Sequence, residues 1–412
     1  MSDSPIDLLT PELMDDPVRT YASLRDQAPL VRVFFPGVPT PVWLVTRHEA
    51  VQSLLSDPRF VRDQGNLPGK TSAGAIVDEM AREYGLPPES LDYMYNSMVM
   101  KDGKDHTRLK SFVAPAFSAR RINALRSYVE GLADRLLPPL VAAGSADLLA
   151  DFAVPLAGST IGEIVGVDEA DRPRMSSWIN DFLSGDPGRI MASGLHIVEY
   201  IKDLTERRRT NPADDLVSTL VRPADNGERL RDIEVSTMIL FLLNTGQNPA
   251  SHFIANATMM LLDHPDQLDK FRADPALMPH VIHETLRVAG TVPIGPSVYA
   301  MEDMDFHGVQ VRQGDALMPA LFAANHDPKK FDHPEQYDVT RVPERVETHL
   351  SFAHGPHYCM GAALARLEAE VVLERLFLRQ EPPALAVARD KVEYLQIPPG
   401  KSFMRSLPVR FR

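Results

Sequence analysis

The chain of 412 residues has a single cysteine, Cys359, in the segment Phe352-Ala-His-Gly-Pro-His-Tyr-Cys-Met-Gly361. Gly355 and Pro356 predict a turn that leaves backbone N–H groups free to point at the sulfur. The residues after Gly361 are strongly helical, so we expect the sulfur at a helix N-terminus, where the helix dipole and N–H donors lower a thiol pKa. A lone cysteine is more often a buried structural residue. The glycines, histidines and aromatic residues around Cys359 favour a metal ligand instead.

A second candidate is the pair Glu284 and Arg287 in the segment Glu-Thr-Leu-Arg. A spacing of three places the acid and the arginine on one face of a helix. Exposed pairs of this kind are common and contribute little to stability. Whether this pair has a structural or functional role therefore depends on the residues around it.

Helical periodicity dominates the segments that must position these residues. The longest helical pattern covers residues 231–263 and ends at His264-Pro265. Short apolar strands are few. We therefore predict a mainly α fold with a small β portion, mainly in residues 28–60 and 290–325. Residues 62–95 are irregular and too long for a plain connection, which indicates a mobile segment or a binding lid.

Composition limits the class of protein. Hydrophobic residues make up 44% and charged residues 24% of the chain, which is ordinary for a globular protein. No Gly/Ser tract, Pro-rich run or repeat divides the sequence, so we expect one domain over residues 1–412. The net charge of −13 argues against nucleic-acid binding. No apolar run approaches the length of a membrane span and the first residues lack a secretory signal, so we expect a cytoplasmic monomer with no membrane partner.

Several motifs together resemble one known family. The pattern Phe352-x-x-Gly355-x-His357-x-Cys359-x-Gly361, followed by Leu364-Ala-Arg-x-Glu368, resembles the haem-ligand signature of a bacterial cytochrome P450. The Glu284-x-x-Arg287 pair lies upstream at the expected distance, and residues 337–341 resemble the family segment that ends in a third partner, Arg341. The resemblance runs from about residue 12 to the C-terminus. It implies the cytochrome P450 fold, with heme b between the long distal helix and the cysteine loop.

The resemblance also implies roles. Cys359 is the expected axial iron ligand, and Glu284, Arg287 and Arg341 are expected to form a buried ionic network that holds the loop. Phe352 would shield the sulfur from water. The remaining residues expected to hold the cofactor are Gly355, Gly361, His106, Lys110 and His357. Lys110 and Val298 stand where the family often has arginines that bind the haem propionates.

The middle of the long helix departs from the family. It reads Thr245-Gly-Gln-Asn-Pro-Ala-Ser251, and alignment on His264-Pro265 puts Asn248 and Pro249 where the family usually has an acid and an alcohol that relay protons. Pro249 cannot donate to the carbonyl of Thr245 and is expected to kink the helix. The candidate catalytic residues are Thr245, Gly246, Asn248, Pro249 and Ser251. Pro249 alternatively only shapes the pocket, with protons arriving through water or a substrate hydroxyl.

Methionine and aromatic residues in the segments that the resemblance assigns to the substrate suggest a sizeable apolar cavity. The same residue types are also typical of ordinary core packing. The candidate substrate contacts are Tyr93, Met94, Met98, Met238, Phe241, Leu242, Ile294, Val298 and Ile397. Four arginines form a candidate basic face for an acidic ferredoxin, or alternatively a scattered solvated surface: Arg108, Arg120, Arg121 and Arg366.

These expectations favour a monooxygenase that inserts one oxygen atom from O2 into a lipophilic small molecule, by hydroxylation or epoxidation. The resemblance suggests a natural-product intermediate as substrate, and electrons from NAD(P)H through ferredoxin reductase and ferredoxin. Two alternatives use the same haem: peroxide-driven oxidation or oxidative coupling, and a haem-thiolate binding protein without turnover.

Overall fold

The computed structural model describes residues 5–8, 10, 14–35, 40–69, 96–184, 186–224, 227–341, 347–395 and 403–411. The chain divides into two compact units. The first, called here the sheet unit, comprises Met1–Ala73, Pro139–Leu149 and His252–Arg412. The second, the helical unit, comprises Gly74–Pro138 and Ala150–Ser251.

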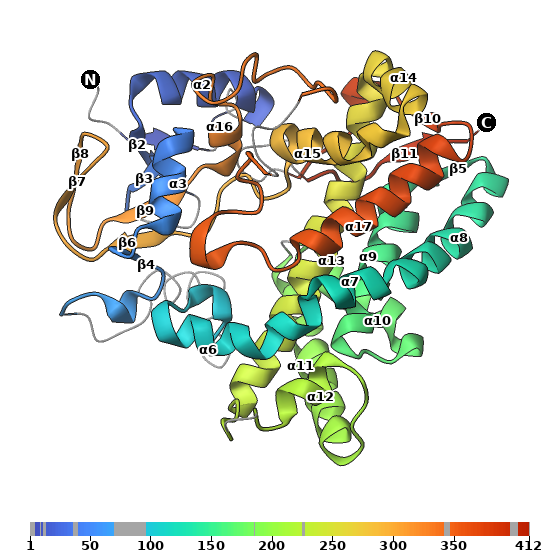
Figure 1. The fold of residues 1–412 in the computed structure, drawn as a ribbon, viewed down its shortest axis with the longest axis horizontal. Helices are drawn as coiled ribbons and strands as arrows, with labels where there is room; N and C mark the ends of the chain where they lie inside the picture. Colours follow the sequence, from blue (N-terminus) through green and yellow to red (C-terminus); the bar gives the residue numbers. More distant parts are fainter. Residues whose placement is uncertain are drawn as a thin grey trace. The chain divides into compact units, whose positions relative to one another are not determined.

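The main sheet of the sheet unit has six strands in the order β1-β2-β3-β9-β6-β4 (Figure 1). β2 pairs antiparallel with β3, and β3 pairs parallel with β9. β6 then pairs antiparallel with both β9 and β4. The strands are β1 (Ile6–Asp7), β2 (Leu30–Phe34), β3 (Val42–Val45), β4 (Phe60–Val61), β6 (Val298–Ala300) and β9 (Ala316–Pro319).

Alternation along β3 explains why both faces of this sheet are covered. Val42 and Leu44 belong to a core cluster with Tyr21 of helix α2 (Pro17–Gln27), whereas Val45 belongs to a different cluster with Leu54 of helix α3 (His48–Ser56). Successive side chains of a strand point to opposite faces. One face of β3 therefore packs against α2 and the other against α3.

Two smaller β structures complete the sheet unit. Strands β7 (Met304–Phe306) and β8 (Val309–Val311) form a hairpin whose turn residues His307 and Gly308 have φ of 52° and 82°, as a two-residue hairpin turn requires. A three-stranded antiparallel sheet has the order β10-β11-β5, from Ala384–Leu385, Pro408–Arg410 and Ser145–Asp147. Asp147 Oδ1 accepts hydrogen bonds from the backbone N–H groups of Leu149 and Leu407, at 3.0 and 2.9 Å, and so joins the middle of the chain to its end.

Helices make up the rest of both units. The sheet unit also contains α14 (Pro265–Ala273), α15 (Met278–Ala289), α16 (Leu321–Asn325) and α17 (Ala362–Leu373). The helical unit contains α6 (Gly103–Val113), α7 (Ala119–Ala124), α9 (Val154–Val165), α10 (Arg172–Phe182), α11 (Pro187–Thr210) and α12 (Leu216–Val221). Two helices begin in one unit and end in the other: α8 (Arg126–Ala143) and α13 (Asp232–Asp263).

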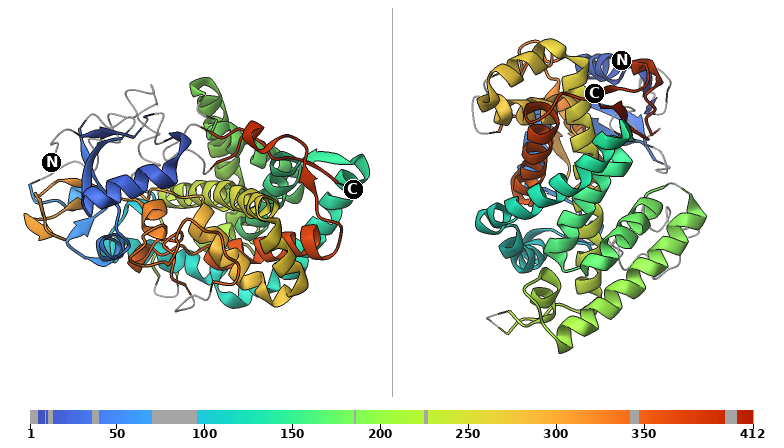
Figure 2. Two further views of the ribbon diagram at one scale, coloured as in Figure 1. Left: turned by 90° about the horizontal axis from the view of Figure 1, so that it is seen from above. Right: turned by 90° about the vertical axis from the view of Figure 1, so that its right-hand side faces the viewer.

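Helix α13 is drawn as one continuous coil in every view, and it runs on through Pro249 instead of ending there (Figure 2). It ends at Asp263, and Pro265 occupies the first position of α14. Asp215 similarly starts α12, since its carboxylate accepts a 2.7 Å hydrogen bond from the Ser218 N–H.

The mainly α fold class predicted from the sequence is confirmed. Four strands fall outside the residues in which the β portion was mainly expected: β1, β5, β10 and β11. One stretch also departs from the expectation about apolar runs. Leu148–Val165 has a mean hydropathy of 1.5 over 18 residues and is 67% buried, and among the described residues it alone is long and apolar enough to cross a membrane; buried core helices pass the same test.

Candidate functional site

The Cys359 loop closes on itself before α17 begins. The Cys359 N–H donates to the carbonyl of Phe352 at 3.0 Å, and the Tyr358 N–H donates to that of Gly355 at the same distance. Gly355 has φ of +72°, and a Cβ there would lie 2.5 Å from the backbone oxygen of Leu55. This position therefore needs glycine both for its conformation and for its neighbour.

The electrostatics of the thiol differ from the expectation. Desolvation by the surrounding protein raises the pKa of Cys359, outweighing the Gly361 and Ala362 N–H groups and the charge of Arg366, which lower it. The prediction of a lowered pKa is therefore wrong for the side chain without a metal. Cys359 is nevertheless an exposed residue. A thiol in such surroundings favours the thiolate when a cation supplies the compensating charge.

The donor set around Cys359 fits haem. In the described part of the chain, no group of three or more His, Cys, Asp or Glu side chains is placed to hold a metal ion. Haem iron needs few protein ligands, because the porphyrin supplies four, whereas structural zinc takes four from the protein. A Cβ on Gly361 would meet only the Cys359 sulfur among described atoms, at 3.8 Å, so this side of the loop is open for a flat group.

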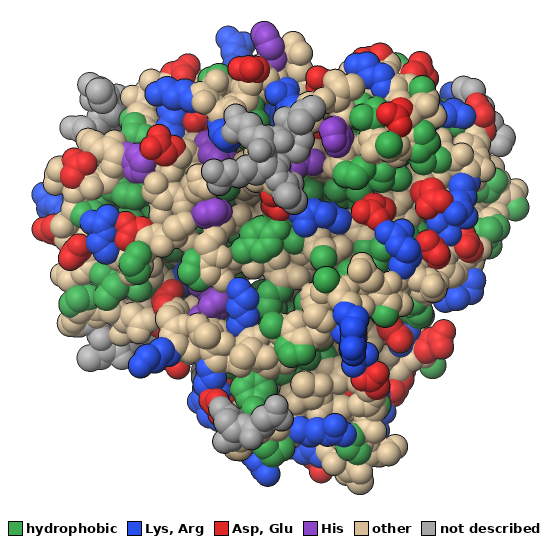
Figure 3. Space-filling view, in the orientation of Figure 1, with side chains coloured by type: hydrophobic (Ala, Val, Ile, Leu, Met, Phe, Trp, Pro, Cys, Tyr) green, Lys and Arg blue, Asp and Glu red, His purple; other side chains and the backbone are tan. Residues whose placement is uncertain are grey.

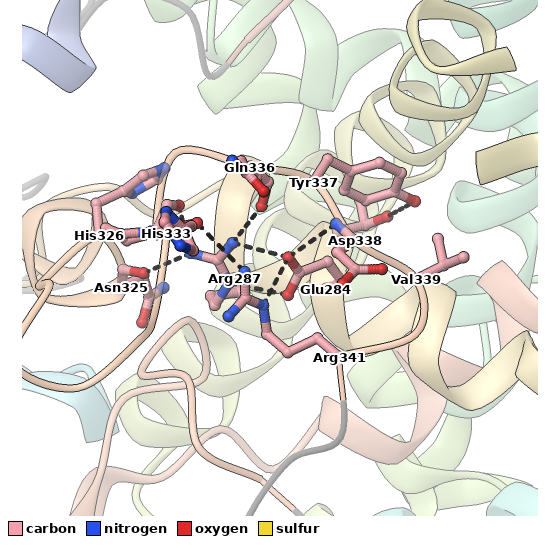
Figure 4. Close-up of polar contacts among 12 residues, drawn as sticks. Glu284, Arg287, Asn325, His326, His333, Gln336, Tyr337, Asp338, Val339 and Arg341 are labelled. Carbon is pink, nitrogen blue, oxygen red and sulfur yellow. Dashed lines mark hydrogen bonds and ion pairs between the residues drawn. The ribbon is translucent and has the colours of Figure 1, made fainter. Parts of the chain in front are cut away.

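Glu284, Arg287 and Arg341 are brought together in the sheet unit (Figure 4). The Glu284 carboxylate accepts two hydrogen bonds from Arg287, at 2.7 and 2.8 Å, and one from Arg341 Nε at 3.1 Å. The side chains of Glu284 and Arg287 are 1% and 0% exposed, whereas that of Arg341 is 17% exposed. The first two are buried charges that depend on each other.

Arg287 also holds the loop that follows α16. Its remaining N–H groups donate to the backbone carbonyls of Asn325, Pro334 and Gln336, at 2.7 to 2.9 Å. All five guanidinium N–H donors thus have an acceptor. The guanidinium therefore links α15 through hydrogen bonds to three backbone carbonyls between residues 325 and 336.

Sequence reasoning missed the residues that join this network to the cysteine loop. Asn325 accepts a 2.7 Å hydrogen bond from the Leu350 N–H and donates a 2.8 Å bond to the Ser351 hydroxyl. Ser351 in turn donates to the backbone carbonyl of Leu286, beside Arg287. The signal was present as a polar residue at the end of the apolar stretch 320–324.

A second group of side chains lies on the cysteine loop itself. Glu347 Oε2 accepts a 2.7 Å hydrogen bond from the Tyr358 hydroxyl and a 2.5 Å bond from Arg366 Nη2. Burial and the Glu347 carboxylate raise the pKa of Tyr358 to about 12, so the phenol remains a donor. Arg366 also lies over the ring of Phe352, 4.8 Å from its centroid.

The middle of α13 presents one accessible face in an otherwise buried stretch. Between residues 234 and 251, the residues that keep accessible surface lie mostly at helical spacing on one side. They are Leu240, Phe241, Asn244, Thr245, Asn248 and Pro249, with Gly246 off this line. The Thr245 hydroxyl donates to the Phe241 carbonyl at 2.8 Å, as helical threonines do.

The other candidate catalytic residues of α13 point elsewhere. Gly246 packs against α9, since a Cβ there would lie 2.4 Å from Cγ1 of Ile161. Ser251 is buried and donates to the Asn248 carbonyl at 3.0 Å. The Gln247 amide, which could also have oriented water, donates to the Ser176 carbonyl and to the Asn180 side chain. Of the candidate catalytic residues, Thr245, Asn248 and Pro249 are the ones with an accessible side chain in this stretch.

The candidate cofactor and substrate residues have mixed environments. His106 is buried on α6, and Lys110 and His357 are partly exposed. Val298 packs in the sheet core with Leu317, which fits core packing. Met98, Met238 and Leu242 are buried, and Phe241 and Ile294 are partly buried. Tyr93, Met94 and Ile397 lie outside the described residues.

Three of the four arginines expected on a basic face already have acidic partners. Arg108 pairs with Glu234, Arg121 with Asp214, and Arg366 with Glu347. Arg120 is exposed and, within the described part of the chain, has no ion-pair partner. On the face drawn in Figure 3, acidic and basic side chains are interspersed.

Comparisons with known proteins show which proteins this chain is similar to. A sequence model described as Cytochrome P450 matches residues 190–381. The chain is 38% identical over 378 residues to 6-deoxyerythronolide B hydroxylase of Saccharopolyspora erythraea, covering 91% of each chain. It is 33% identical to cytochrome P450 monooxygenase PikC of Streptomyces venezuelae, covering 96% of this chain and 91% of PikC. Among solved structures, myxobacterial cytochrome P450 CYP267B1 in complex with myristic acid has a TM-score of 0.87 at 31% identity, covering 98% of each chain.

Proposed function

Because the chain belongs to the cytochrome P450 family, we propose that it inserts one oxygen atom from O2 into a lipophilic natural-product intermediate. The chain is a haem-thiolate monooxygenase, and its cofactor is heme b. The observation that carries the proposal is the accessible Cys359 sulfur at the start of α17, with the Gly361 and Ala362 N–H groups directed at it.

The chemistry of oxygen activation belongs to the haem when it is bound, and the chain supplies its ligand, its orientation and the path for protons. Cys359 would be the axial ligand, with Gly361 leaving space beside the sulfur and Phe352 covering the loop. His106, Lys110 and His357 would bind the propionates. Glu284, Arg287 and Arg341 hold the loop geometry, since a fully bonded buried network fixes positions more than it stabilises the fold.

Proton supply is the unusual part of the proposal. Asn248 is an amide and cannot act as an acid near neutral pH, and Pro249 has no side-chain hydroxyl. Thr245 has an accessible hydroxyl, and its backbone carbonyl lacks the N–H partner that Pro249 cannot supply. We propose that water held near Thr245 and a hydroxyl of the substrate together deliver the protons.

Substrate class and partners are inferred from the relatives and from the family. Three similar proteins are named 6-deoxyerythronolide B hydroxylase, Polyketide biosynthesis cytochrome P450 PksS and Mycinamicin IV hydroxylase/epoxidase. We therefore propose a polyketide-like intermediate for this chain. Electrons would come from NAD(P)H through ferredoxin reductase and ferredoxin, and the enzyme would act as a cytoplasmic monomer.

One experiment separates this function from its alternatives. The haem-loaded protein is given compounds that shift its Soret band, with either a surrogate ferredoxin system or hydrogen peroxide, and product and reductant are both measured. We expect product with the ferredoxin system. Product from peroxide alone would contradict the proposal and favour peroxide-driven oxidation or coupling. If no shifting compound yields product, a haem-thiolate binding protein is favoured.

The proton source is tested by Asn248→Asp combined with Pro249→Thr. If protons come through the substrate, product formed per reductant consumed should change little with the true substrate. A large gain in this ratio would show that the wild-type helix lacks a relay that the reaction needs.

A further inference from the structure

Four side chains enclose the cysteine loop of the sheet unit. Glu347 precedes the loop, Phe352 and Tyr358 belong to it, and Arg366 follows it on α17; together they are called here the Glu347 cluster. Glu347 binds both Tyr358 and Arg366 through one carboxylate oxygen. Arg366 lies over Phe352, and the Phe352 and Tyr358 rings are 6.4 Å apart. The four contacts form a closed ring.

This ring surrounds the ligand at short range in sequence and space. Tyr358 immediately precedes Cys359, and the Cys359 N–H is bonded to the carbonyl of Phe352. The Glu347 carboxylate therefore contacts Tyr358 directly before Cys359 and Arg366 seven residues after it. Glu347 and Arg366 are 17% and 31% exposed, so water screens their charges only in part.

The two charges act on the sulfur in opposite directions. Arg366 is positive and Glu347 is negative, and Glu347 binds both Arg366 and Tyr358, the residue before Cys359. Opposite charges also have opposite effects on the oxidation state of a metal bound to that sulfur. A nearby positive charge favours the more reduced form, and a negative charge favours the more oxidised form. Groups behind a metal ligand are known to tune metal centres in this way.

We propose that Glu347 is a positioning residue that sets the reduction potential of the haem by holding Arg366 and Tyr358 against the cysteine loop. The carboxylate fixes where the Arg366 charge lies and offsets part of it. This inference rests on Cys359 being the haem ligand. It assigns to Glu347, which belongs to none of the sequence motifs, control over how readily the enzyme accepts its first electron.

A purely structural clamp predicts a different result. If the Glu347 cluster only stiffens the loop, then loss of either charge loosens the same contacts and alters the potential in the same direction, or not at all. If it acts through charge, the two losses have opposite signs. Substitutions that keep shape while removing charge separate these cases.

The test measures the midpoint potential of the haem-loaded protein by spectroelectrochemistry for Glu347→Gln, Arg366→Gln and the double variant. Glu347→Gln keeps an acceptor for Tyr358 and Arg366 and should shift the potential to a more positive value. Arg366→Gln should shift it to a more negative value, and the double variant should return close to wild type. Arg366→Lys keeps the positive charge but loses the planar guanidinium and its stacking on Phe352. It should shift the potential less than Arg366→Gln does.

Glu374→Gln is the matched control, since Glu374 also pairs with arginines but lies beyond α17. Shifts of the same sign for Glu347→Gln and Arg366→Gln, or shifts no larger than that of Glu374→Gln, would overturn the proposal. The reduced carbon-monoxide spectrum is recorded for every protein. Absence of the thiolate-type band in the wild type would instead refute Cys359 as the ligand, so the two failures are distinguishable.

Discussion

Gly355 and Leu55 approach so closely that a Cβ on Gly355 would lie 2.5 Å from the Leu55 carbonyl oxygen. The neighbour is backbone and cannot rotate away. Helix α3 thus restricts the turn that leads to Cys359, although the two segments are about three hundred residues apart in sequence.

The substitution Gly355→Ala should therefore destabilise the protein and reduce its haem content. Gly308→Ala is a matched control, because Gly308 has φ of +82° and a Cβ there would meet no described atom within 4 Å. The control should lose about 1–2 kcal/mol from backbone strain alone. Gly355→Ala should lose about 1–3 kcal/mol more through overpacking. Urea unfolding and the haem-to-protein absorbance ratio measure both effects, and equal losses would contradict the close approach.

Removal of Glu284 should be among the most damaging changes in the sheet unit. Glu284→Ala leaves the guanidinium of Arg287 buried without its counter-charge, which costs about 3–5 kcal/mol. Glu130→Ala, in the partly exposed Arg126–Glu130 pair, should cost less than about 1 kcal/mol. The free energies of unfolding of the two variants, measured under the same conditions, test this difference. Similar values would mean that the Glu284–Arg287 pair is not isolated from water.

Buried histidines should make the protein sensitive to acid. Burial lowers the pKa values of His252, His283 and His326 to about 4. Below about pH 6.5 these histidines bind protons in the unfolded chain but stay neutral in the folded protein. The free energy of unfolding therefore falls as the pH drops from about 6.5 to about 4. Each histidine contributes up to about 1.4 kcal/mol per pH unit in this window. Above it these groups have no effect.

Unfolding free energies at pH 7, 6 and 5 check this expectation, and His326→Gln should flatten the slope. The amide can still donate to the Phe322 carbonyl, which His326 Nδ1 contacts at 2.9 Å. An unchanged slope in this variant would show that His326 is protonated in the folded protein.

Close packing of α13 against α9 gives a prediction for the helical unit. Gly246→Ala should destabilise the protein by about 1–3 kcal/mol, since its Cβ would lie 2.4 Å from Cγ1 of Ile161. Ile161→Ala alone should cost about 2–5 kcal/mol through the cavity it leaves. The double variant should cost less than the sum, because each change relieves the other. Additive losses would place the helices farther apart than described.

The parts of the site that could be predicted from sequence are those with local signals. Gly355 and Pro356 predict the turn before Cys359. Helical periodicity, together with Pro265, predicts the length of α13. The spacing of Glu284 and Arg287 predicts a shared helix face, although burial of the pair depends on the loop carbonyls that Arg287 binds. These signals act within a few residues, so a single sequence contains them.

Other parts depend on contacts between distant segments. The Asn325–Ser351 and Glu347–Arg366 contacts join residues 26 and 19 positions apart. Strands β5, β10 and β11 have two or three residues each, too few to show alternation. The predicted direction of the Cys359 pKa shift is also wrong. The N–H donors that lower the pKa are close in sequence and can be predicted, whereas the desolvation that raises it comes from residues brought together by folding.

The small sheet β10-β11-β5 has a consequence for how the protein is made. The sheet unit is assembled from three stretches of chain, and β5 belongs to the second stretch whereas β10 and β11 belong to the third. On the ribosome, β5 must wait until β11, about 260 residues further along the chain, has left the exit tunnel. The helical unit, whose last segment ends at Ser251, can begin to fold much earlier. Completion of the sheet unit is therefore expected to come later than folding of the helical unit.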